Sequence, residues 1–113
     1  MVVSKKQTPA NALTAAIVNY LNLNGGCVTR VNSTGMHRNG RWTYSTTRKG
    51  TPDIMGAYNG KPIGIEVKIG KDKQSDYQKQ FEEDYTKSGG VYIIAKTFDQ
   101  FYEDFNNSLK KVL

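Results

Sequence analysis

Apolar residues recur along this chain with two different spacings, and each spacing predicts one kind of secondary structure. From residue 9 to residue 24 they return every three or four positions, which is typical of an amphipathic helix. Thr8 is expected to be the N-cap of this helix, and Pro9 suits its first position. Gly25-Gly26 is expected to end it. We expect its buried stripe to consist of Leu13, Ala16, Ile17, Tyr20 and Leu21.

Two further helices are predicted in the second half of the chain. Ser75 and Gln78 form the Ser-x-x-Gln pattern of a capping box, and Thr97 and Gln100 form a second box. The first of these helices ends at Gly89-Gly90. The apolar run VYIIA between them predicts a central strand. The residues at helical spacing are Tyr77, Phe81, Asp84 and Tyr85 in one helix and Phe98, Phe101, Tyr102, Phe105, Leu109 and Val112 in the other.

Three short strands are predicted between the first helix and the second, at residues 27–31, 52–58 and 61–69. Asn59-Gly60 separates the last two strands, and this dipeptide favours a two-residue type I′ turn. A second Asn-Gly pair lies in the polar segment 34–49, where the flanking residues alternate poorly. We expect a basic loop or a β-ribbon there.

The type I′ turn brings charged residues together. It pairs Tyr58 with Lys61 and, counting outwards, Asp53 with Glu66 on one face of the hairpin. Lys68 shares that face, because it lies two residues beyond Glu66 on the same strand. The apolar residues Ile54, Ile63, Ile65 and Val67 fall on the other face, so a slip of one residue would disrupt both sets.

The order of elements is helix, strand, ribbon, two strands, helix, strand and helix. It indicates a single α/β domain over residues 1–113, with a mixed central sheet flanked by helices. Residues 1–7 are expected to be flexible. Hydrophobic residues make up 37% of the chain, enough for a modest core, which makes self-association plausible.

The net charge of +6 favours a polyanionic partner, nucleic acid above all. A single cysteine, Cys27, excludes an intrachain disulfide and suits the reducing cytoplasm. We find no long apolar run, so we expect neither a signal peptide nor a membrane span.

Two adjacent carboxylates repel each other, and a divalent cation relieves that repulsion. Mg²⁺ or Mn²⁺ would suit the oxygen ligands of Asp53 and Glu66, and Lys68 would stabilise an attacking water or a phosphoryl transition state. Cys27 and His37, each the only one of its kind, cannot build a zinc site. We interpret His37 as an ordinary exposed residue in preference to a general base. A surface salt-bridge patch remains an alternative for the three charged residues.

The spacing Pro52-Asp53, twelve residues, then Glu66-Val67-Lys68 resembles the PD-(D/E)xK nuclease signature. More narrowly, the chain from Pro9 to about Phe105 resembles the small VRR-NUC nucleases, including the stand-alone phage and bacterial forms. The segments that carry the resemblance are "GGCVTRVN", "RKGTPDIMG", "GIEVKIGKDKQSDYQKQF" and "SGGVYIIAKTFDQFYEDF".

This resemblance implies a restriction-endonuclease-like fold and a Mg²⁺- or Mn²⁺-dependent deoxyribonuclease, with no small-molecule cofactor. Asp53, Glu66 and the backbone carbonyl of Val67 would bind the metal, and Lys68 would serve the attacking water. Gln78 matches a glutamine of the family pattern, and its role as capping partner of Ser75 is an equal alternative.

The chain departs from the family at its first helix, where many relatives carry a supporting glutamate. Residues 9–24 contain no acid, so Asn11 or Asn19 would have to face the site instead. This departure places a second metal ion in doubt. It also keeps two alternatives open, namely a catalytically inactive DNA-binding module and a recombination accessory protein.

The family acts on DNA, often at branched or flapped structures, and its stand-alone members resemble dimeric junction-resolving enzymes. We therefore expect a DNA endonuclease that works as a homodimer and selects DNA structure, not sequence. Trp42 and Tyr44 could stack on bases or pack in the ribbon or a dimer contact. Basic residues expected to contact phosphates are Arg38, Arg41, Arg48, Lys49, Lys71 and Lys73, with Lys5 and Lys6 near the N-terminus.

Overall fold

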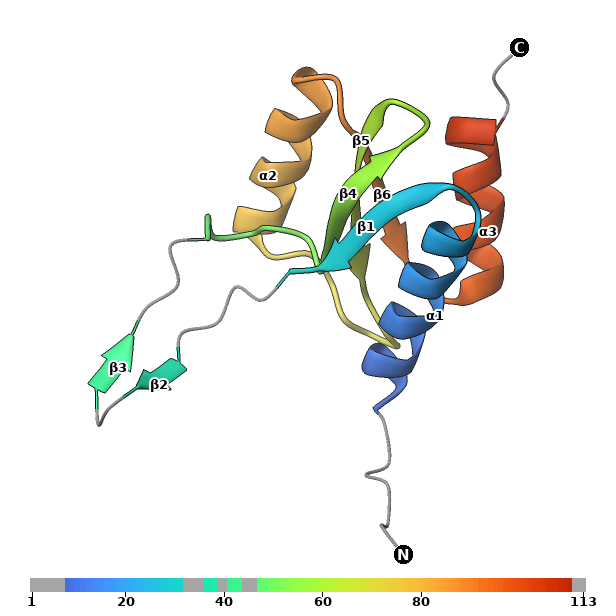
Figure 1. Cartoon of the computed structure of the whole chain (residues 1–113). Helices are drawn as coiled ribbons and strands as arrows, with labels where there is room; N and C mark the ends of the chain where they lie inside the picture. The colour runs from blue at the N-terminus through green and yellow to red at the C-terminus, as the bar shows by residue number, and fades with distance from the viewer. Residues whose placement is uncertain (1–7, 32–35, 39–40, 44–46, 111–113) are drawn as a thin grey trace, which may run out of the picture.

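A computed structural model describes residues 8–31, 36–38, 41–43 and 47–110 (Figure 1). The order of elements agrees with the prediction. None of the described helices is long and apolar enough to cross a membrane. The elements are α1 Pro9–Leu23, β1 Gly26–Arg30, β2 Met36–Arg38, β3 Arg41–Thr43, β4 Ile54–Tyr58, β5 Lys61–Val67, α2 Asp76–Lys87, β6 Val91–Ala95 and α3 Phe98–Phe105, which a π-helical turn, Asn106–Lys110, extends.

Four strands form a mixed sheet in the order β1-β4-β5-β6. The first two strand pairs are antiparallel and the β5–β6 pair is parallel, so the predicted mixed sheet is confirmed. Helices α1 and α3 cover one face of this sheet and α2 covers the other (Figure 1). Strands β2 and β3 form a separate two-stranded ribbon that stands away from the sheet, which decides between the loop and the ribbon expected for this segment (Figure 1).

The β4–β5 hairpin has the predicted turn and register. Asn59 and Gly60 have φ angles of 51° and 81°, the two positive values that a type I′ turn requires. Tyr58 pairs with Lys61 and Ile54 with Ile65, as counted from the turn.

The apolar core lies between the sheet and the α1–α3 pair. In the predicted stripe of α1, Leu13, Ile17 and Leu21 are buried and Tyr20 is half-buried against the core, but Ala16 is exposed. Thr14 is buried in its place, and its hydroxyl donates to the carbonyl of Ala10 at 2.8 Å. Because that bond satisfies the hydroxyl within the helix, a threonine can occupy an apolar face. The core residues on the four strands are Val28, Ile54, Ile63, Ile65, Val67, Ile93 and Ala95.

Two predictions about the C-terminal third are wrong. Strand β6 is apolar but lies at the edge of the sheet, with β5 as its one strand neighbour among the described residues. Its two faces are covered by α2 and α3, and this cover explains an apolar sequence at an edge. At the start of α3, the Thr97 hydroxyl accepts from the backbone amide of Gln100. The side-chain oxygen of Gln100, however, accepts from the backbone amide of Lys96, not from that of Thr97. The second capping box is therefore incomplete.

Candidate active site

Three predicted site residues meet at one end of the β4–β5 hairpin. Asp53 directly precedes β4, and its Oδ2 accepts a hydrogen bond from the Val67 amide at 2.7 Å. Glu66 lies one residue before the end of β5 and is only 2% exposed. The Nζ atom of Lys68 is 4.0 Å from Glu66 Oε1, and its side chain is 15% exposed. The register of the hairpin thus places two acids and one base together.

Both carboxylate oxygens of Glu66 accept hydrogen bonds from neighbouring elements. Gln78 Nε2 of α2 donates to Oε1 at 3.0 Å, and the Tyr92 hydroxyl of β6 donates to Oε2 at 3.0 Å. Tyr92 lies across from Gly64 in the parallel β5–β6 pair, and Glu66 is the next residue of β5 on that face. These two bonds hold the carboxylate in one orientation at the border between sheet and helix.

Gln78 caps α2 and also contacts Glu66. Its side-chain oxygen accepts from the Ser75 amide at 2.8 Å, while the Ser75 hydroxyl accepts from the Gln78 amide at 3.2 Å. This is a complete capping box at the start of α2. The remaining group of the side-chain amide, Nε2, is the one that reaches Glu66. The helix cap and the carboxylate contact therefore use different atoms of one residue.

Burial and the carboxylate of Asp53 raise the pKa of Glu66 to about 7. Burial contributes most, followed by the negative charge of Asp53 and a hydrogen bond with it. Tyr92 and Lys68 lower the pKa of Glu66, but by less. The pKa of the Tyr92 phenol is itself raised above its ordinary value, first by burial and then by Glu66. The pair of carboxyls therefore favours holding a proton when no cation is bound.

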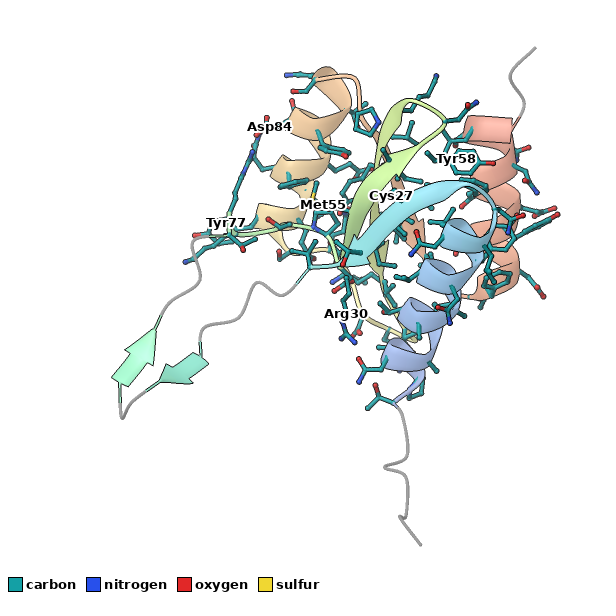
Figure 2. All side chains as sticks on the ribbon, viewed as in Figure 1. Cys27, Arg30, Met55, Tyr58, Tyr77 and Asp84 are labelled. Carbon is teal, nitrogen blue, oxygen red and sulfur yellow. The ribbon has the colours of Figure 1, made fainter. Side chains whose placement is uncertain are left out.

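The segment before Asp53 is fastened to α2. Gly50 has φ +85°, and a Cβ atom there would lie 2.2 Å from the carbonyl oxygen of Tyr77, so only glycine allows this approach. The guanidinium of Arg48 pairs with Asp84 and lies 5.1 Å from the centre of the Phe81 ring. Lys49 Nζ lies 5.1 Å from the centre of the Tyr77 ring. Tyr77 and Asp84 mark this outer side of α2 in Figure 2. Arg48 and Lys49, for which the sequence predicts DNA contacts, thus attach the segment that leads to Asp53 to α2.

The first helix carries no acid, and the side chain of Asn11 at its start bonds to Arg30 of β1. Asn11 Oδ1 accepts from Arg30 Nη2 at 2.7 Å. Arg30 pairs with Ile54, the neighbour of Asp53, and Figure 2 shows it at the end of the sheet beside α1. The side-chain oxygen of Asn11 is therefore already bonded to a cationic side chain. Asn19 is exposed two turns further along α1.

The other predicted DNA contacts are scattered. Arg38 and Arg41 are partners in the β2–β3 ribbon, as are His37 and Trp42. Lys71 and Lys73 are exposed on the segment between β5 and α2. Lys5, Lys6 and Tyr44 lie outside the described residues.

Two polar residues near Glu66 escaped the sequence analysis. Gln74 Nε2 donates to Glu82 Oε1 at 3.1 Å and to the Tyr92 hydroxyl oxygen at 3.4 Å, so Tyr92 links Gln74 to Glu66. A signal for Tyr92 existed, since it is the one residue of the run VYIIA with a hydroxyl. We find no sequence signal for Gln74.

The donor atoms at this site fit an oxygen-preferring divalent cation. Two carboxyls lie close enough to raise the pKa of one of them, and a cation between them would remove that repulsion. In the described part of the chain, no group of three or more His, Cys, Asp or Glu side chains is arranged to hold a metal. The pair formed by Asp53 and Glu66 suits an ion like Mg²⁺, which binds through one or two carboxylates and keeps several waters.

The fold is similar to that of a solved structure described as "VRR_NUC domain protein". The TM-score is 0.58, the identity is 18%, and the match covers 94% of this chain and 92% of the other. No family model matches the sequence, and no curated protein matches it. The fold is therefore a VRR-NUC fold of restriction-endonuclease-like architecture, a four-stranded mixed sheet with three flanking helices.

Proposed function

We propose that this protein is a nuclease that hydrolyses phosphodiester bonds in DNA with the help of Mg²⁺ or Mn²⁺. The proposal rests on one observation: Asp53, Glu66 and Lys68 converge at the end of a hairpin, with Glu66 buried. A buried carboxyl beside a second carboxyl costs stability, and such groups cluster at functional sites. The similarity in fold to a VRR_NUC domain protein supports a nuclease, as does the PD-(D/E)xK spacing.

Asp53, Glu66 and the backbone carbonyl of Val67 would hold the cation. When bound, it polarises a phosphoryl oxygen and lowers the pKa of water. Gln78 and Tyr92 keep the Glu66 carboxylate oriented through one hydrogen bond to each oxygen. Lys68 would place its positive charge beside the attacking water and the pentavalent phosphorus. Attack in line with the leaving 3′ oxygen gives 5′-phosphate and 3′-hydroxyl ends.

The excess of basic residues supports DNA as the substrate, because phosphate neutralisation gives affinity without regard to sequence. The family resemblance favours a more specific form of this proposal. The nuclease would be of the stand-alone phage type, would act as a homodimer and would select flaps, branches or junctions in DNA.

A second candidate function is DNA binding without cleavage. It is favoured by the absence of any acid from residues 9–24, which leaves Asp53 and Glu66 without a supporting carboxylate from α1. A single carboxylate pair would then hold a metal ion weakly.

A cleavage assay separates the two candidates. Supercoiled plasmid and branched oligonucleotides are incubated with Mg²⁺ or Mn²⁺, or with a chelator. We expect the wild type to cleave only with metal and the Asp53→Ala and Lys68→Ala variants to lose cleavage. Glu103→Ala and Lys87→Ala serve as controls, because both residues are exposed. Binding without cleavage under either metal would favour the second candidate, and undiminished cleavage by Asp53→Ala would refute the site.

A further inference from the structure

A hollow of about 250 Å³ adjoins the carboxylate site and is lined by four lysines. Lys68 belongs to both places, because its Nζ is 4.0 Å from Glu66 and its side chain also lines the hollow. The other lysines come from three different parts of the fold: Lys73 from the loop after β5, Lys79 from α2 and Lys96 from the position directly after β6. Asp72 is the one acid among the lining residues.

The positive charge of this hollow is not neutralised within the described part of the chain. Lys73, Lys79 and Lys96 have no acidic partner within 4.0 Å there, whereas Lys87 on the same helix as Lys79 pairs with Glu83 at 3.1 Å. Four lysines against the single acid Asp72 give the hollow a positive lining, and an anion that enters it would be attracted by several ammonium groups at once. The arrangement therefore suits a ligand with concentrated negative charge.

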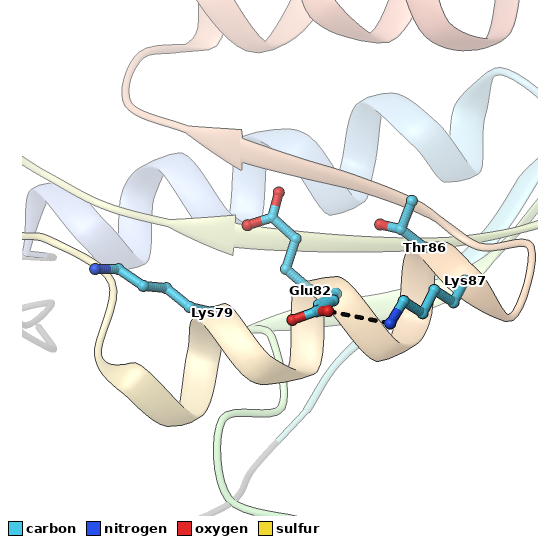
Figure 3. Close-up of a pocket in the computed structure, with 5 residues that line it drawn as sticks. Lys79, Glu82, Thr86 and Lys87 are labelled. Carbon is cyan, nitrogen blue, oxygen red and sulfur yellow. Dashed lines mark hydrogen bonds and ion pairs between the residues drawn. The ribbon is translucent and has the colours of Figure 1, made fainter.

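A second hollow, of about 370 Å³, gives an instructive contrast. It is lined by five residues of α2, Lys79, Glu82, Glu83, Thr86 and Lys87 (Figure 3). Its charges balance, and it does not include the carboxylate pair. In Figure 3 the Lys79 side chain extends towards the start of α2, away from Lys87. Lys79 also lines the basic hollow, where no equal number of acids balances the lysines.

The basic hollow suits a phosphate and not a base. Its described lining contains lysines, Asp72, Gln74 and Ile94, but no aromatic ring on which a nucleobase could stack. Gln74 is held by Glu82 and by Tyr92, which also bonds Glu66, so the wall of the hollow and the carboxylate site share one hydrogen-bond network. A phosphate here would be a near neighbour of one at the carboxylates.

We propose that this hollow binds an internal backbone phosphate of the DNA strand, next to the phosphate that is cleaved. This inference rests on the proposed function and adds Lys79 and Lys96 to the residues that bind the substrate. The subsite positions the strand, so that the scissile phosphate meets Asp53, Glu66 and Lys68.

Binding is tested in the presence of a chelator, so that affinity is measured without cleavage. Fluorescence anisotropy with a labelled branched oligonucleotide compares wild type with Lys79→Ala/Lys96→Ala at several salt concentrations. We expect about tenfold weaker binding, and a slope of log affinity against log salt that is shallower by about 1. Lys79→Arg/Lys96→Arg should restore affinity. The control, Lys61→Ala/Lys87→Ala, removes the same charge at the hairpin turn and at the far end of α2, and should change affinity less than about threefold.

A second arm locates the phosphate. Single phosphates of the cleaved strand are replaced by neutral methylphosphonates on either side of the cleavage position. We expect one flanking replacement to weaken the binding of wild type by as much as the Lys79→Ala/Lys96→Ala substitutions weaken the binding of unmodified DNA. The same replacement should not weaken the binding of the Lys79→Ala/Lys96→Ala variant any further. Additive losses at every position, or equal losses in the control variant, would overturn the subsite. If wild type cleaves DNA but the double alanine variant binds DNA as tightly as wild type, the subsite is refuted and the proposed function stands. Wild type that neither binds nor cleaves DNA would refute both proposals.

Discussion

The two faces of the four-stranded sheet differ in what they bury. Towards α1 and α3 the sheet contributes aliphatic side chains, among them Ile54, Ile63 and Ile65, all fully buried. Towards α2 it buries Glu66, with both carboxylate oxygens hydrogen-bonded. Both faces belong to the same hairpin, and alternate residues of β5 supply them.

The two faces contribute differently to the stability of the fold. Aliphatic burial stabilises the fold by about 25 cal/mol per Å² of apolar surface. Burying a carboxyl beside another carboxyl has the opposite effect on the free energy of folding, and an apolar residue would avoid it. Under the proposed function, the composition of the face under α2 serves the reaction, and that of the opposite face serves stability.

The largest effect is expected when the chemical face is altered without changing its shape. Glu66→Gln keeps the volume of the side chain but removes the carboxylate that would bind metal. We predict a loss of at least about 10³-fold in single-turnover cleavage, on the scale of losing a principal catalytic group. Glu103→Gln on α3 is the matched control and should cleave like wild type. Cleavage by Glu66→Gln within tenfold of wild type would contradict this division between the two faces.

The opposite face should respond in stability. Ile65→Ala leaves a cavity opposite α1 and α3, and we predict a loss of about 3 kcal/mol in the free energy of unfolding. Urea denaturation measures this loss. Cleavage per folded molecule should fall far less than for Glu66→Gln, since Ile65 faces away from the carboxylates. An equal loss of activity in the two variants would show that the faces are not separable.

The pH dependence of stability should reveal the Glu66 carboxyl in metal-free protein. Its pKa is about 7 in the folded state, against 4.5 as the ordinary value, so the folded state binds more protons between these values. The free energy of unfolding should therefore fall as pH rises from 4.5 through 7, by about 3 kcal/mol.

Thermal unfolding of wild type and Glu66→Gln, with a chelator and between pH 5 and pH 8, measures this dependence. Glu66→Gln should lack the fall in stability that the Glu66 carboxyl causes as pH rises. Adding Mn²⁺ should stabilise the wild type most at the higher pH. Equal slopes in the two proteins would show that Glu66 ionises normally.

The smallest effect separates the two functions of Gln78. Ser75→Ala and Gln78→Ala each remove half of the capping box, and each should cost about 1 kcal/mol of stability. Only Gln78→Ala also removes the hydrogen bond to Glu66. Calorimetric titration with Mn²⁺ should therefore show weaker binding for Gln78→Ala than for Ser75→Ala. Equal affinities would indicate that Gln78 is a helix cap alone.

Much of the fold could be predicted because its signals are local. The caps at Thr8 and Ser75 and the turn at Asn59-Gly60 each depend on neighbouring residues. The edge position of β6 could not be predicted, because an apolar strand covered by helices on both faces resembles a central strand in sequence. The burial of Thr14 was missed for a similar reason, since its hydroxyl is satisfied inside its own helix.

The site was predictable to the extent that the hairpin defines it. Asp53, Glu66 and Lys68 follow from the register, whereas Tyr92 and Gln74 come from elements whose packing no spacing in the chain specifies. The basic hollow was missed for the same reason, because Lys79 and Lys96 are far from Lys68 along the chain.

The sequence by itself determined the meeting of Asp53 with Glu66. A two-residue turn with two left-handed residues allows one register, and that register aligns the carboxyls as it aligns Ile54 with Ile65. Only the tertiary structure decided the state of those carboxyls. The pKa of Glu66 rises because α2 and β6 close over it and exclude water, and that closure depends on packing between elements distant in the chain.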